Sequence, residues 1–527
     1  MPYRSLPHLA DDQPKPARAP RWRAGRVAGL AVGLVLAAPI ADLVSPHPMP
    51  APAGFGWQVV PHAEARRAKP AVKRAAARAK QRRIEAALEK ARQRRKAATA
   101  ALPAAPIVSL PNPAAATLPT IAEMRAAVLA TPAAQLVRVG RHLIVGYHNA
   151  AQLTPLLERG AIGGVFVTAR NAGGRSKEML AAEIARFRAL AAKGGQSPFW
   201  ISTDQEGGGV SRLSPPLPRQ PSLARVIAEL KTPEARQLAV AQFAERQAEA
   251  LAGIGVDLNF APVADLNLDA RNARDRFTRL RHRAVSADPA VVSEVARTYC
   301  EHLARHAIAC TLKHFPGIGR VVADTHVTPA TLKTPRDVLA AADWVPFRAV
   351  LSTTPAFLMV GHPHVAALDR EARPASTSSA VIDGIVRKEL GFDGVVITDD
   401  LAMGAIRRRP GGMPRAAVEA LAAGADLVLL GLDGDQIYAV LYAMLAAEKS
   451  GEVGRDRWRE SAARLRKAAA AAALVAEQRS PVPLGSGDTT SSPPPADAKA
   501  SLSGKAVGEV KAGSDKSSAG ATKTVRQ

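Results

Sequence analysis

A short apolar run passes directly into a polar loop at Ala307-Ile308-Ala309-Cys310-Thr311-Leu312-Lys313-His314-Phe315-Pro316-Gly317-Ile318-Gly319-Arg320. The first six residues are strand-like, whereas Pro316, Gly317 and Gly319 break regular structure. Asp324 and His326 follow in the same loop. Ionisable groups that follow the carboxyl end of a strand are typical of catalytic residues in a closed parallel barrel.

The same pattern recurs along the middle of the chain, where apolar runs alternate with amphipathic helical stretches. The runs are Leu143–Tyr147, Gly164–Thr168, Phe199–Thr203, Val256–Pro262, Ala307–His314, Ala356–His362, Gly394–Thr398 and Asp426–Gly431. The helical stretches include Lys177–Ala192, Pro233–Leu251, Pro289–His306, Val338–Leu351, Ser378–Leu390 and Arg415–Ala423. Eight such units predict an α/β fold, a single (β/α)8 TIM-type barrel. An open doubly wound sheet is the alternative, but no Gly-rich phosphate fingerprint follows the first run.

Polar groups follow several of the predicted strands. The third strand ends in Thr203–Leu213, the fourth in Asp257–Asp265, the sixth in His362-Pro363-His364, and the seventh in Asp399-Asp400. Carboxylates and arginine bind hydroxyl groups through charge-assisted hydrogen bonds, so this rim suits a neutral polyhydroxylated ligand. Glycoside hydrolysis requires paired acid and base groups on either side of a sugar.

Four motifs give the chain a specific resemblance. Residues from about 118 to 475 resemble the bacterial β-N-acetylglucosaminidases of glycoside hydrolase family 3, the NagZ-type enzymes. The motifs are Asp204–Leu213, Asn259-Phe260-Ala261-Pro262-Val263, Lys313–His326 and Asp399-Asp400-Leu401-Ala402-Met403, in the family's order and with its internal spacing.

The resemblance implies roles for individual residues. Asp399 matches the family's nucleophile, His326 its general acid/base, and Asp324 the partner that orients the imidazole. Physically, a nearby carboxylate stabilises imidazolium and holds one tautomer, so His326 can deliver a proton near neutral pH. The sugar-binding positions that match are Asp204, Arg212, Arg283, Lys313 and His314. The implied activity is that of a retaining β-N-acetylhexosaminidase acting on terminal β-linked N-acetylglucosamine of peptidoglycan- or chitin-derived oligosaccharides.

The chain departs from the family pattern in two places. The family's further arginine falls within Leu280-Arg281-His282-Arg283, where the spacing to Asp288-Pro289 selects Arg283 and leaves Arg281 as the alternative. The usual Gly-His-Gly-Asp of the loop is Gly317-Ile318-Gly319-Arg320 here. This change motivates an alternative function, a sugar- or cell-wall-binding protein with weakened turnover. β-Glucosidase-type specificity is a further alternative.

Other polar residues have structural interpretations. We expect Asp400 to cap the helix at about 401–408 or to accept hydrogen bonds, Asp257 and Asp265 to hold rim loops, and Glu206 to be a turn residue. His362 and His364 either line the pocket or cap the sixth strand. No histidine pair has the spacing of a zinc motif, so we expect no metal and no cofactor.

The termini differ in composition from the barrel. Residues 1–26 form a basic region, and 27–45 are apolar enough for a signal peptide or signal-anchor helix. Residues 46–117 are an Ala/Arg/Lys-rich linker, 118–478 the catalytic barrel, and 479–527 a Ser/Pro/Lys-rich tail expected to be disordered. This order predicts an exported cell-envelope protein, either anchored to the membrane or released beyond it.

Much of the net charge of +25 lies at the amino end. Residues 1–100 contribute +14, concentrated in Arg66–Lys96, which we expect to be helical or disordered. This segment is either a spacer or a contact for an anionic partner, an envelope surface or nucleic acid. Because the rim has few aromatic residues to stack on bases, we expect no specific nucleic acid. We also expect a monomer, with Cys300 and Cys310 as buried free thiols.

Overall fold

The computed structural model describes residues 119–268, 277–431 and 434–479. The predicted segments 1–26, 27–45 and 46–117, with Arg66–Lys96 among them, lie outside the described residues, as does the tail from 480. Within the described ranges, no helix is both long and apolar enough to cross a membrane.

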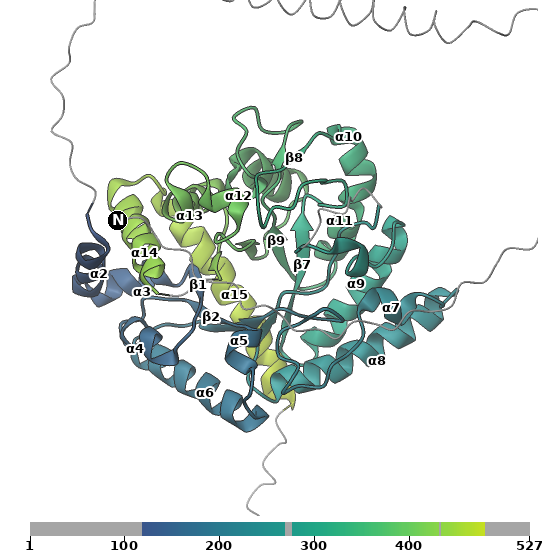
Figure 1. The fold of residues 1–527 in the computed structure, drawn as a ribbon, viewed down its shortest axis with the longest axis horizontal. Helices are drawn as coiled ribbons and strands as arrows, with labels where there is room; N and C mark the ends of the chain where they lie inside the picture. The colour runs from purple at the N-terminus through teal and green to yellow at the C-terminus, as the bar shows by residue number, and fades with distance from the viewer. Residues whose placement is uncertain (1–118, 269–276, 432–433, 480–527) are drawn as a thin grey trace, which may run out of the picture. The chain divides into compact units, whose positions relative to one another are not determined.

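Eight parallel strands form the centre of the fold (Figure 1). They are β1 (Leu143–Gly146), β2 (Gly164–Val167), β3 (Trp200–Thr203), β6 (Leu258–Asn259), β7 (Ala309–Phe315), β9 (Phe357–Val360), β11 (Val396–Thr398) and β12 (Val428–Leu430). Each strand coincides with one of the eight predicted apolar runs, in the predicted chain order, and only β7 extends past its run, by Phe315. The spatial order β11-β9-β7-β6-β3-β2-β1-β12 follows the chain, with β12 returning beside β1.

The two ends of this sheet meet, which nearly closes a barrel. Ile397 of β11 forms a parallel bridge with Leu427, just before β12. The N–H of Thr398 donates to the carbonyl of Leu427 at 3.0 Å. The (β/α)8 prediction is therefore confirmed for the barrel, and the open-sheet alternative is wrong. Parallel strands with a single, helix-filled crossover each return in the same direction and curl until the first and last strands pair.

Helices surround the strands in Figure 1. Those that form the outer layer and its connections are α2 (Ile121–Ala130), α3 (Ala133–Gly140), α4 (Ala150–Glu158), α5 (Ala169–Ala172), α6 (Lys177–Lys193), α7 (Leu223–Ile227), α8 (Pro233–Ala252), α9 (Pro289–Ala304), α10 (Arg336–Val338), α11 (Val345–Leu351), α13 (Gly412–Ala423), α14 (Asp435–Ser450) and α15 (Arg455–Arg479). Two π-helical segments, η2 (Leu339–Asp343) and η4 (Ala380–Glu389), lie within the predicted stretches Val338–Leu351 and Ser378–Leu390, and α11 forms the rest of the first stretch from Val345. Local sequence sets the starts of α8 and α9, since Thr232 and Asp288 cap backbone N–H groups and a proline follows each.

The barrel interior is filled by alternate residues of the strands. Ile144, Leu258 and Leu429 belong to one buried cluster, together with Leu465 of α15. Leu143 and Val145, which flank Ile144, pack instead into the larger cluster with the outer helices. Because successive strand side chains point to opposite faces, a strand buried on both sides is continuously apolar. This explains why the predicted strands were apolar runs rather than alternating patterns.

The prediction of free thiols is wrong. Cys300 of α9 and Cys310 of β7 form a disulfide, with their Cα atoms 5.3 Å apart. The tight turn between α9 and β7 folds the strand back along the helix, and this brings the two thiols within bonding reach. Ten residues of sequence separation do not reveal that approach, which depends on how the helix packs on its own strand.

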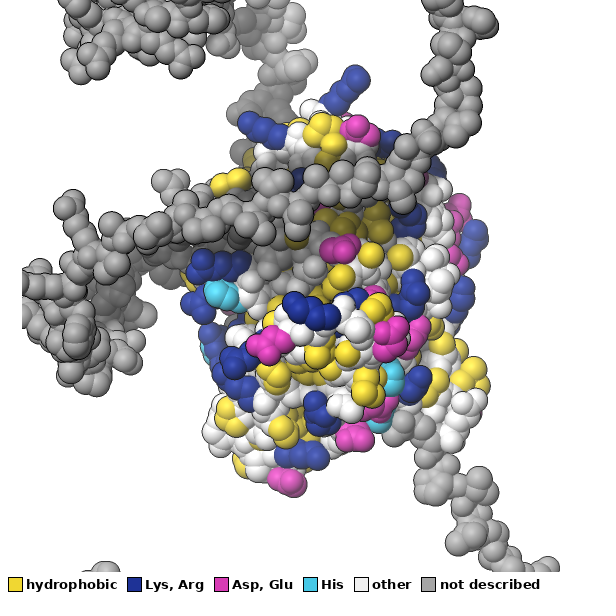
Figure 2. Space-filling model, turned by 90° about the vertical axis from the view of Figure 1, so that its right-hand side faces the viewer, with side chains coloured by type: hydrophobic (Ala, Val, Ile, Leu, Met, Phe, Trp, Pro, Cys, Tyr) yellow, Lys and Arg dark blue, Asp and Glu magenta, His cyan; other side chains and the backbone are white. Residues whose placement is uncertain are grey.

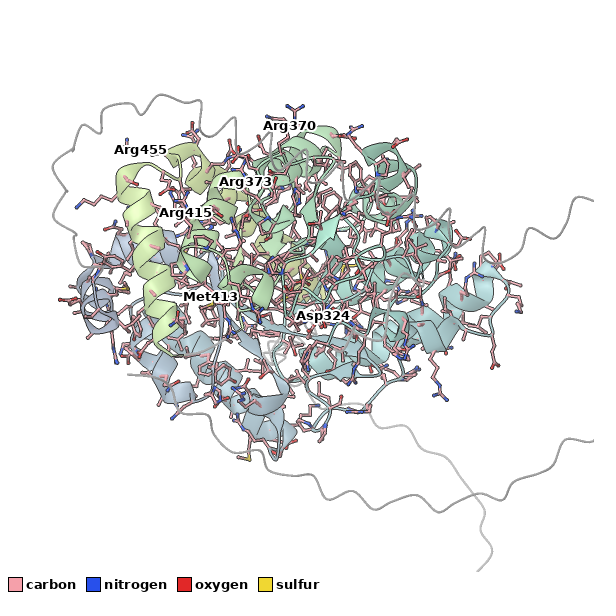
Figure 3. All side chains as sticks on the ribbon, turned by 45° about the horizontal axis from the view of Figure 1, so that its top comes forward. Asp324, Arg370, Arg373, Met413, Arg415 and Arg455 are labelled. Carbon is pink, nitrogen blue, oxygen red and sulfur yellow. A yellow bond between two sulfur atoms is a disulfide. The ribbon has the colours of Figure 1, made fainter. Side chains whose placement is uncertain are left out.

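The outer surface has a mixed character. On the face drawn in Figure 2, basic, acidic and hydrophobic side chains alternate over short distances. Figure 3 shows a similar contrast in depth, since Arg370 projects outward while Asp324 lies among packed side chains. Charged side chains are therefore both exposed at the surface and enclosed among packed side chains.

Candidate active site

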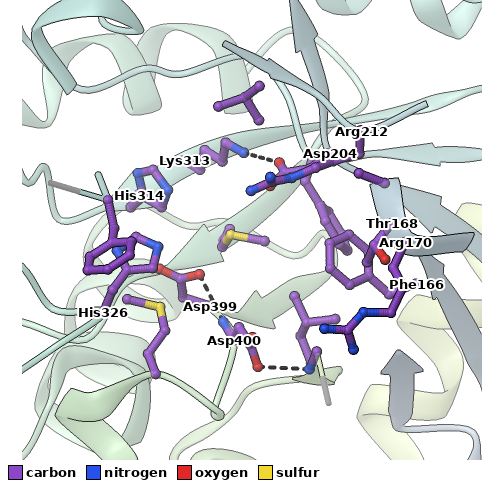
Figure 4. A pocket seen from close by; sticks show the side chains of 18 of the residues that line it. Phe166, Thr168, Arg170, Asp204, Arg212, Lys313, His314, His326, Asp399 and Asp400 are labelled. Atoms are coloured by element: carbon purple, nitrogen blue, oxygen red, sulfur yellow. Dashed lines mark hydrogen bonds and ion pairs between the residues drawn. The ribbon is translucent and has the colours of Figure 1, made fainter. Parts of the chain in front are cut away.

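A cavity of about 370 Å³ opens at the carboxyl ends of the strands (Figure 4). It collects side chains that follow several different strands, among them β1, β2, β3, β7 and β11, and that are far apart in sequence. Its polar lining residues are Tyr147, His148, Thr168, Arg170, Asp204, Arg212, Arg283, Lys313, His314, His326, Asp399 and Asp400, and its apolar ones include Phe166, Val210, Phe260, Phe277, Met359, Met403 and Leu429. Every predicted site residue except Asp324 lines this cavity.

Asp399 and Asp400 follow β11 and have different surroundings. Burial would raise the pKa of Asp399, but the neighbouring imidazoles of His314, His362 and His326 outweigh it and lower that pKa. Asp399 is therefore an ionised carboxylate. Burial raises the pKa of Asp400 to about 6, although its carboxylate accepts backbone hydrogen bonds.

The carboxylate of Asp400 binds backbone N–H groups and does not cap a helix. Its Oδ1 accepts from the N–H groups of Ala402 and Gly431, both at 2.8 Å. The helix expected at about 401–408 is shorter, α12 (Gly404–Arg407), and no side chain caps it. Of the two roles predicted for Asp400, that of a hydrogen-bond acceptor is confirmed. These two hydrogen bonds join the loop that follows β11 to the end of β12. Asp400 thereby fixes the backbone next to Asp399.

Asp324 lies directly behind His326. Its Oδ1 is 2.9 Å from Nδ1 of His326 and also accepts from the hydroxyl of Thr278 at 3.1 Å. Its Oδ2 accepts from the N–H of Phe277 at 2.9 Å. Burial opposes ionisation of Asp324, but these N–H donors and the imidazole outweigh it, and the pKa of the carboxyl is lowered. A carboxylate against Nδ1 keeps the proton on that nitrogen and leaves Nε2 of His326 for chemistry.

Four charged side chains, of which Lys313 and Glu206 are buried, form a network on the opposite side of the cavity. Nζ of Lys313 lies 2.5 Å from Asp204 and 2.6 Å from Glu206. The guanidinium of Arg283 donates two hydrogen bonds to the carboxylate of Glu206, of 2.9 and 2.6 Å. Both cations lower the pKa of Glu206 despite its burial. Buried charges are tolerated only when they are paired in this way, so each member depends on the others for its position.

Glu206 was wrongly expected to be a turn residue. It lies on β4 (Gln205–Gly207), which pairs with β5 (Val210–Ser211), and its side chain is only 7% exposed. Gly208 and Gly209 make the hairpin turn between the two strands. The sequence did hold an indication of this role. Glu206 lies two residues after Asp204, and side chains two positions apart in an extended segment point to the same face.

The sequence left Arg283 and Arg281 as alternatives for the family's further arginine, and the structure distinguishes them. Arg283 lines the cavity, whereas Arg281 is exposed and contacts the neighbouring His282. Arg212 lines the cavity from an exposed position, and its N–H donates to the carbonyl of Asp204.

Asp265 and Asp257 are structural, as expected. Asp265 accepts from Nδ1 of His314 at 2.7 Å and from the N–H of Ile318 at 2.7 Å, so it orients one cavity imidazole and anchors the loop after it. Asp257 binds Arg188 and the N–H of Ile201 away from the cavity. These contacts hold the barrel rim rather than a ligand.

Neither His362 nor His364 lines the cavity. His362 is buried between the hydroxyl of Ser376 at 2.7 Å and the carbonyl of Asp400 at 2.9 Å. Burial lowers its pKa and outweighs the opposing effect of the Asp399 carboxylate. His364 is on β10 (His364–Val365), which pairs with β8 (Thr331–Leu332), and its ring contacts the carbonyl of Asp369.

The two atypical loop residues are both anchored. Ile318 is buried in the main hydrophobic cluster. Nε of Arg320 lies 2.8 Å from Oδ2 of Asp343, a fully buried carboxylate at the end of η2. Loss of the family's histidine and acid is thus accompanied by an apolar contact and an ion pair that fix this loop.

Sequence reasoning missed the residues that follow β1 and β2. Tyr147, His148, Thr168 and Arg170 line the cavity, and Arg170 contacts Nδ1 of His148 at 2.7 Å. Both strands were predicted, and the rule that strand ends form one rim applies to them equally. Among the residues that the structure describes, no cluster of His, Cys, Asp and Glu has the makings of a metal site.

Comparison with known proteins places this arrangement in a family. The glycosyl hydrolase family 3 N-terminal domain matches residues 129–468. A β-hexosaminidase of Xanthomonas oryzae pv. oryzae is 35% identical over 291 residues, covering 54% of this chain and 81% of that protein. A β-hexosaminidase of Stenotrophomonas maltophilia is 36% identical, with the same coverage.

Solved structures that resemble this chain also belong to glycoside hydrolase family 3. A family 3 β-N-acetylglucosaminidase from Paenibacillus is 29% identical, with a TM-score of 0.59 over 68% of this chain and 65% of that one. A family 3 glycosyl hydrolase from Mycobacterium smegmatis is 34% identical, with a TM-score of 0.56 over 65% of this chain and 98% of that one. The chain therefore belongs to glycoside hydrolase family 3 and to its β-N-acetylhexosaminidases.

Proposed function

We propose that the protein is a retaining exo-glycosidase that removes terminal, non-reducing β-linked N-acetylglucosamine from peptidoglycan- or chitin-derived oligosaccharides. The observation that carries this proposal is that Asp399 and His326 line one cavity, with Asp324 bound to the far nitrogen of His326. An ionised carboxylate and an oriented imidazole at one cavity are the nucleophile and the proton donor that a retaining glycosidase needs.

The first step follows from these groups. The carboxylate of Asp399 attacks the anomeric carbon while the bond to the leaving oxygen breaks. Nε2 of His326 gives its proton to that oxygen, and Asp324 stabilises the imidazolium before transfer and holds the ring afterwards. In the second step a water molecule attacks the glycosyl-enzyme, returns its proton to Nε2, and frees Asp399.

The sugar is held by groups on the far side of the cavity from His326. In Figure 4, Asp204, Arg212 and Lys313 lie across the cavity from His326. Asp204 accepts hydrogen bonds from sugar hydroxyls, and Lys313 and Arg212 donate them. Arg283, positioned by Glu206, belongs to this set. His314, positioned by Asp265, completes the sugar-binding groups from the side of the cavity where His326 lies (Figure 4).

The test compares release of nitrophenol from an aryl N-acetyl-β-glucosaminide and from the aryl β-glucoside, using the full chain. We expect the N-acetyl substrate to be strongly preferred, and the sugar product to form first as the β-anomer when followed by NMR. Asp399→Asn should abolish turnover and retain sugar binding. First formation of the α-anomer contradicts the retaining mechanism. Ligand-induced stabilisation without turnover in the wild-type protein supports the sugar-binding alternative instead.

We also propose that the enzyme is exported to the cell envelope. The Cys300–Cys310 disulfide supports this, since disulfides persist mainly in oxidising compartments. The apolar segment 27–45 would direct export. Fractionation of cells that express the full chain tests the proposal, and recovery of the enzyme with cytoplasmic markers would refute it.

A further inference from the structure

A second cavity, of about 580 Å³, lies next to β4, whose Gln205 is one of its lining residues. Helix α8, the loop 216–221 and the first residue of α6 enclose it. Its lining residues are Lys177, Gln205, Pro216, Leu217, Pro218, Arg219, Gln220, Pro221, Arg246, Gln247, Glu249, Ala250 and Leu251. It shares none of these with the catalytic cavity. Its volume is in the range of small-molecule sites.

The chemistry of this second cavity is asymmetric. Six of its thirteen lining residues are proline, leucine or alanine, and these make most of the lining surface apolar. Three exposed cations stand around it: Lys177, Arg219 and Arg246. Across the described ranges, none of the three forms an ion pair. The acidic lining residue is Glu249. An apolar cavity with unpaired cations at its edge complements a molecule with an apolar body and an anionic head.

The floor adds a polar group. Gln247 is 2% exposed, and its side-chain oxygen accepts from the hydroxyl of Tyr299 and from Nδ2 of Asn259. Its amide nitrogen is buried and has no hydrogen-bond partner among the described residues. An unsatisfied buried donor costs free energy, and an acceptor atom that reaches the floor would satisfy it.

Gln205 connects the second cavity to the sugar-binding side. It stands between Asp204 and Glu206, and its backbone N–H and C=O are both bound by the side chain of Asn259, at 2.9 Å each. Its side-chain nitrogen donates to the hydroxyl of Ser214 at 2.7 Å, at the start of the loop that walls the cavity. A ligand that moves this loop therefore acts on the strand that carries Glu206.

We propose that this cavity is a second binding site, for a small carboxylate with an apolar chain, and that its occupancy changes the affinity of the catalytic site for sugar. Arg219 and Arg246 bind the carboxylate, and the proline- and leucine-lined walls take the chain. The binding step is independent of the proposed reaction, whereas the coupling rests on it.

The probe is octanoate, added to the full chain and followed by calorimetry and thermal unfolding, with 1-octanol as the uncharged counterpart. We expect saturable octanoate binding, a raised Tm and weaker binding of octanol. Arg219→Ala combined with Arg246→Ala should weaken octanoate binding by about tenfold or more. Arg225→Ala, at an exposed arginine of α7 outside the cavity, should leave it unchanged. Equal binding by wild type and the double variant, or no saturable binding, would overturn the proposal.

A second variant separates this cavity from adventitious apolar binding. Ala250→Phe fills the wall on α8 and should abolish octanoate binding while turnover without octanoate persists. If it misfolds by circular dichroism, Arg219→Glu with Arg246→Glu serves the same purpose. Coupling is read from KM for the aryl substrate, which octanoate should change in wild type and not in the filled variant. Binding with an unchanged KM refutes the coupling, and absence of turnover in every sample without octanoate refutes the proposed reaction instead.

Discussion

The N–H of Gly404 donates a hydrogen bond of 2.8 Å to the carbonyl oxygen of His326. The next N–H, that of Ala405, donates to the carbonyl of Thr325 at 3.1 Å. The loop that carries the proposed acid is thereby attached to the segment that follows the proposed nucleophile. Two motifs more than seventy residues apart in the sequence are set in register by main-chain contacts, which do not depend on side-chain identity.

Gly404→Ala should disturb that register. A Cβ atom at this position would lie 2.2 Å from the carbonyl oxygen of Val327, so the acid loop must shift. We expect kcat on an N-acetylglucosamine disaccharide to fall by about 10- to 100-fold, because small displacements of catalytic groups are costly. Gly454→Ala, where a Cβ meets open space, is the matched control. Unchanged kcat in Gly404→Ala would show that the loop adjusts freely.

His326→Ala should have an effect that depends on the leaving group. A disaccharide needs a proton on its leaving oxygen, so its kcat/KM should fall by about 10²–10⁴-fold. An activated nitrophenyl glycoside needs little proton donation and should lose much less. Measurement of both substrates with one preparation decides the matter, and equal losses would contradict His326 as the acid.

Asp400→Asn should stabilise the protein above pH 6 and have little effect below pH 4. The carboxyl has a pKa of about 6 when folded and 3.8 as the ordinary value. The contribution of Asp400 to the free energy of unfolding is therefore fully present below the ordinary pKa of 3.8. It is lost as the pH rises through the folded pKa of about 6. Asparagine resembles the neutral acid at every pH, so we expect a gain of about 2–3 kcal/mol at pH 8. Denaturant unfolding at pH 4 and pH 8 measures it, and an equal effect at both would refute the assignment.

Arg320→Ala should destabilise the protein at neutral pH. Oδ1 of Asp343 has no partner among the described residues, so its buried carboxylate depends on Arg320. Burial already raises the pKa of Asp343. We expect a loss of about 1–3 kcal/mol at neutral pH, which becomes smaller as the pH falls and Asp343 is protonated. Adding Asp343→Asn should recover part of it.

The control for Arg320→Ala is Arg336→Ala, which breaks an exposed pair with Glu389. This change should cost about 1 kcal/mol or less, since exposed ion pairs contribute little. Comparable losses in the two variants would mean that the Arg320 contact does no more than a surface pair.

Reduction of the Cys300–Cys310 disulfide should lower the free energy of unfolding by about 2–3 kcal/mol, the value for closing a loop of this size in the unfolded chain. Unfolding with and without dithiothreitol measures this change. Cys300→Ser combined with Cys310→Ser should match the reduced protein and should not respond to the reductant.

The sequence was sufficient for elements whose pattern is local and periodic. All eight strands and the long helices α6, α8 and α9 were predicted, because a strand buried on both faces is a continuous apolar run and these helices have capped, periodic starts. The predicted helical stretches did not include α14 and α15. The motifs also identified Asp399, His326, Lys313 and the other cavity residues as candidates. Glu206 and the cysteine pair were assigned wrongly, because each depends on what lies across the fold: two cations for Glu206, and the inner face of α9 for Cys310.

By itself, the sequence determined the barrel, its strand order and the set of ionisable groups at its rim, since these follow from hydrophobic pattern, chain order and motif. Only the tertiary structure decided how those groups are paired. It selected Arg283 over Arg281, removed His362 from the cavity, and turned the atypical Ile318 and Arg320 into anchors. Pairing of buried charges depends on distances of a few ångströms between distant segments, and these are fixed only when the barrel closes.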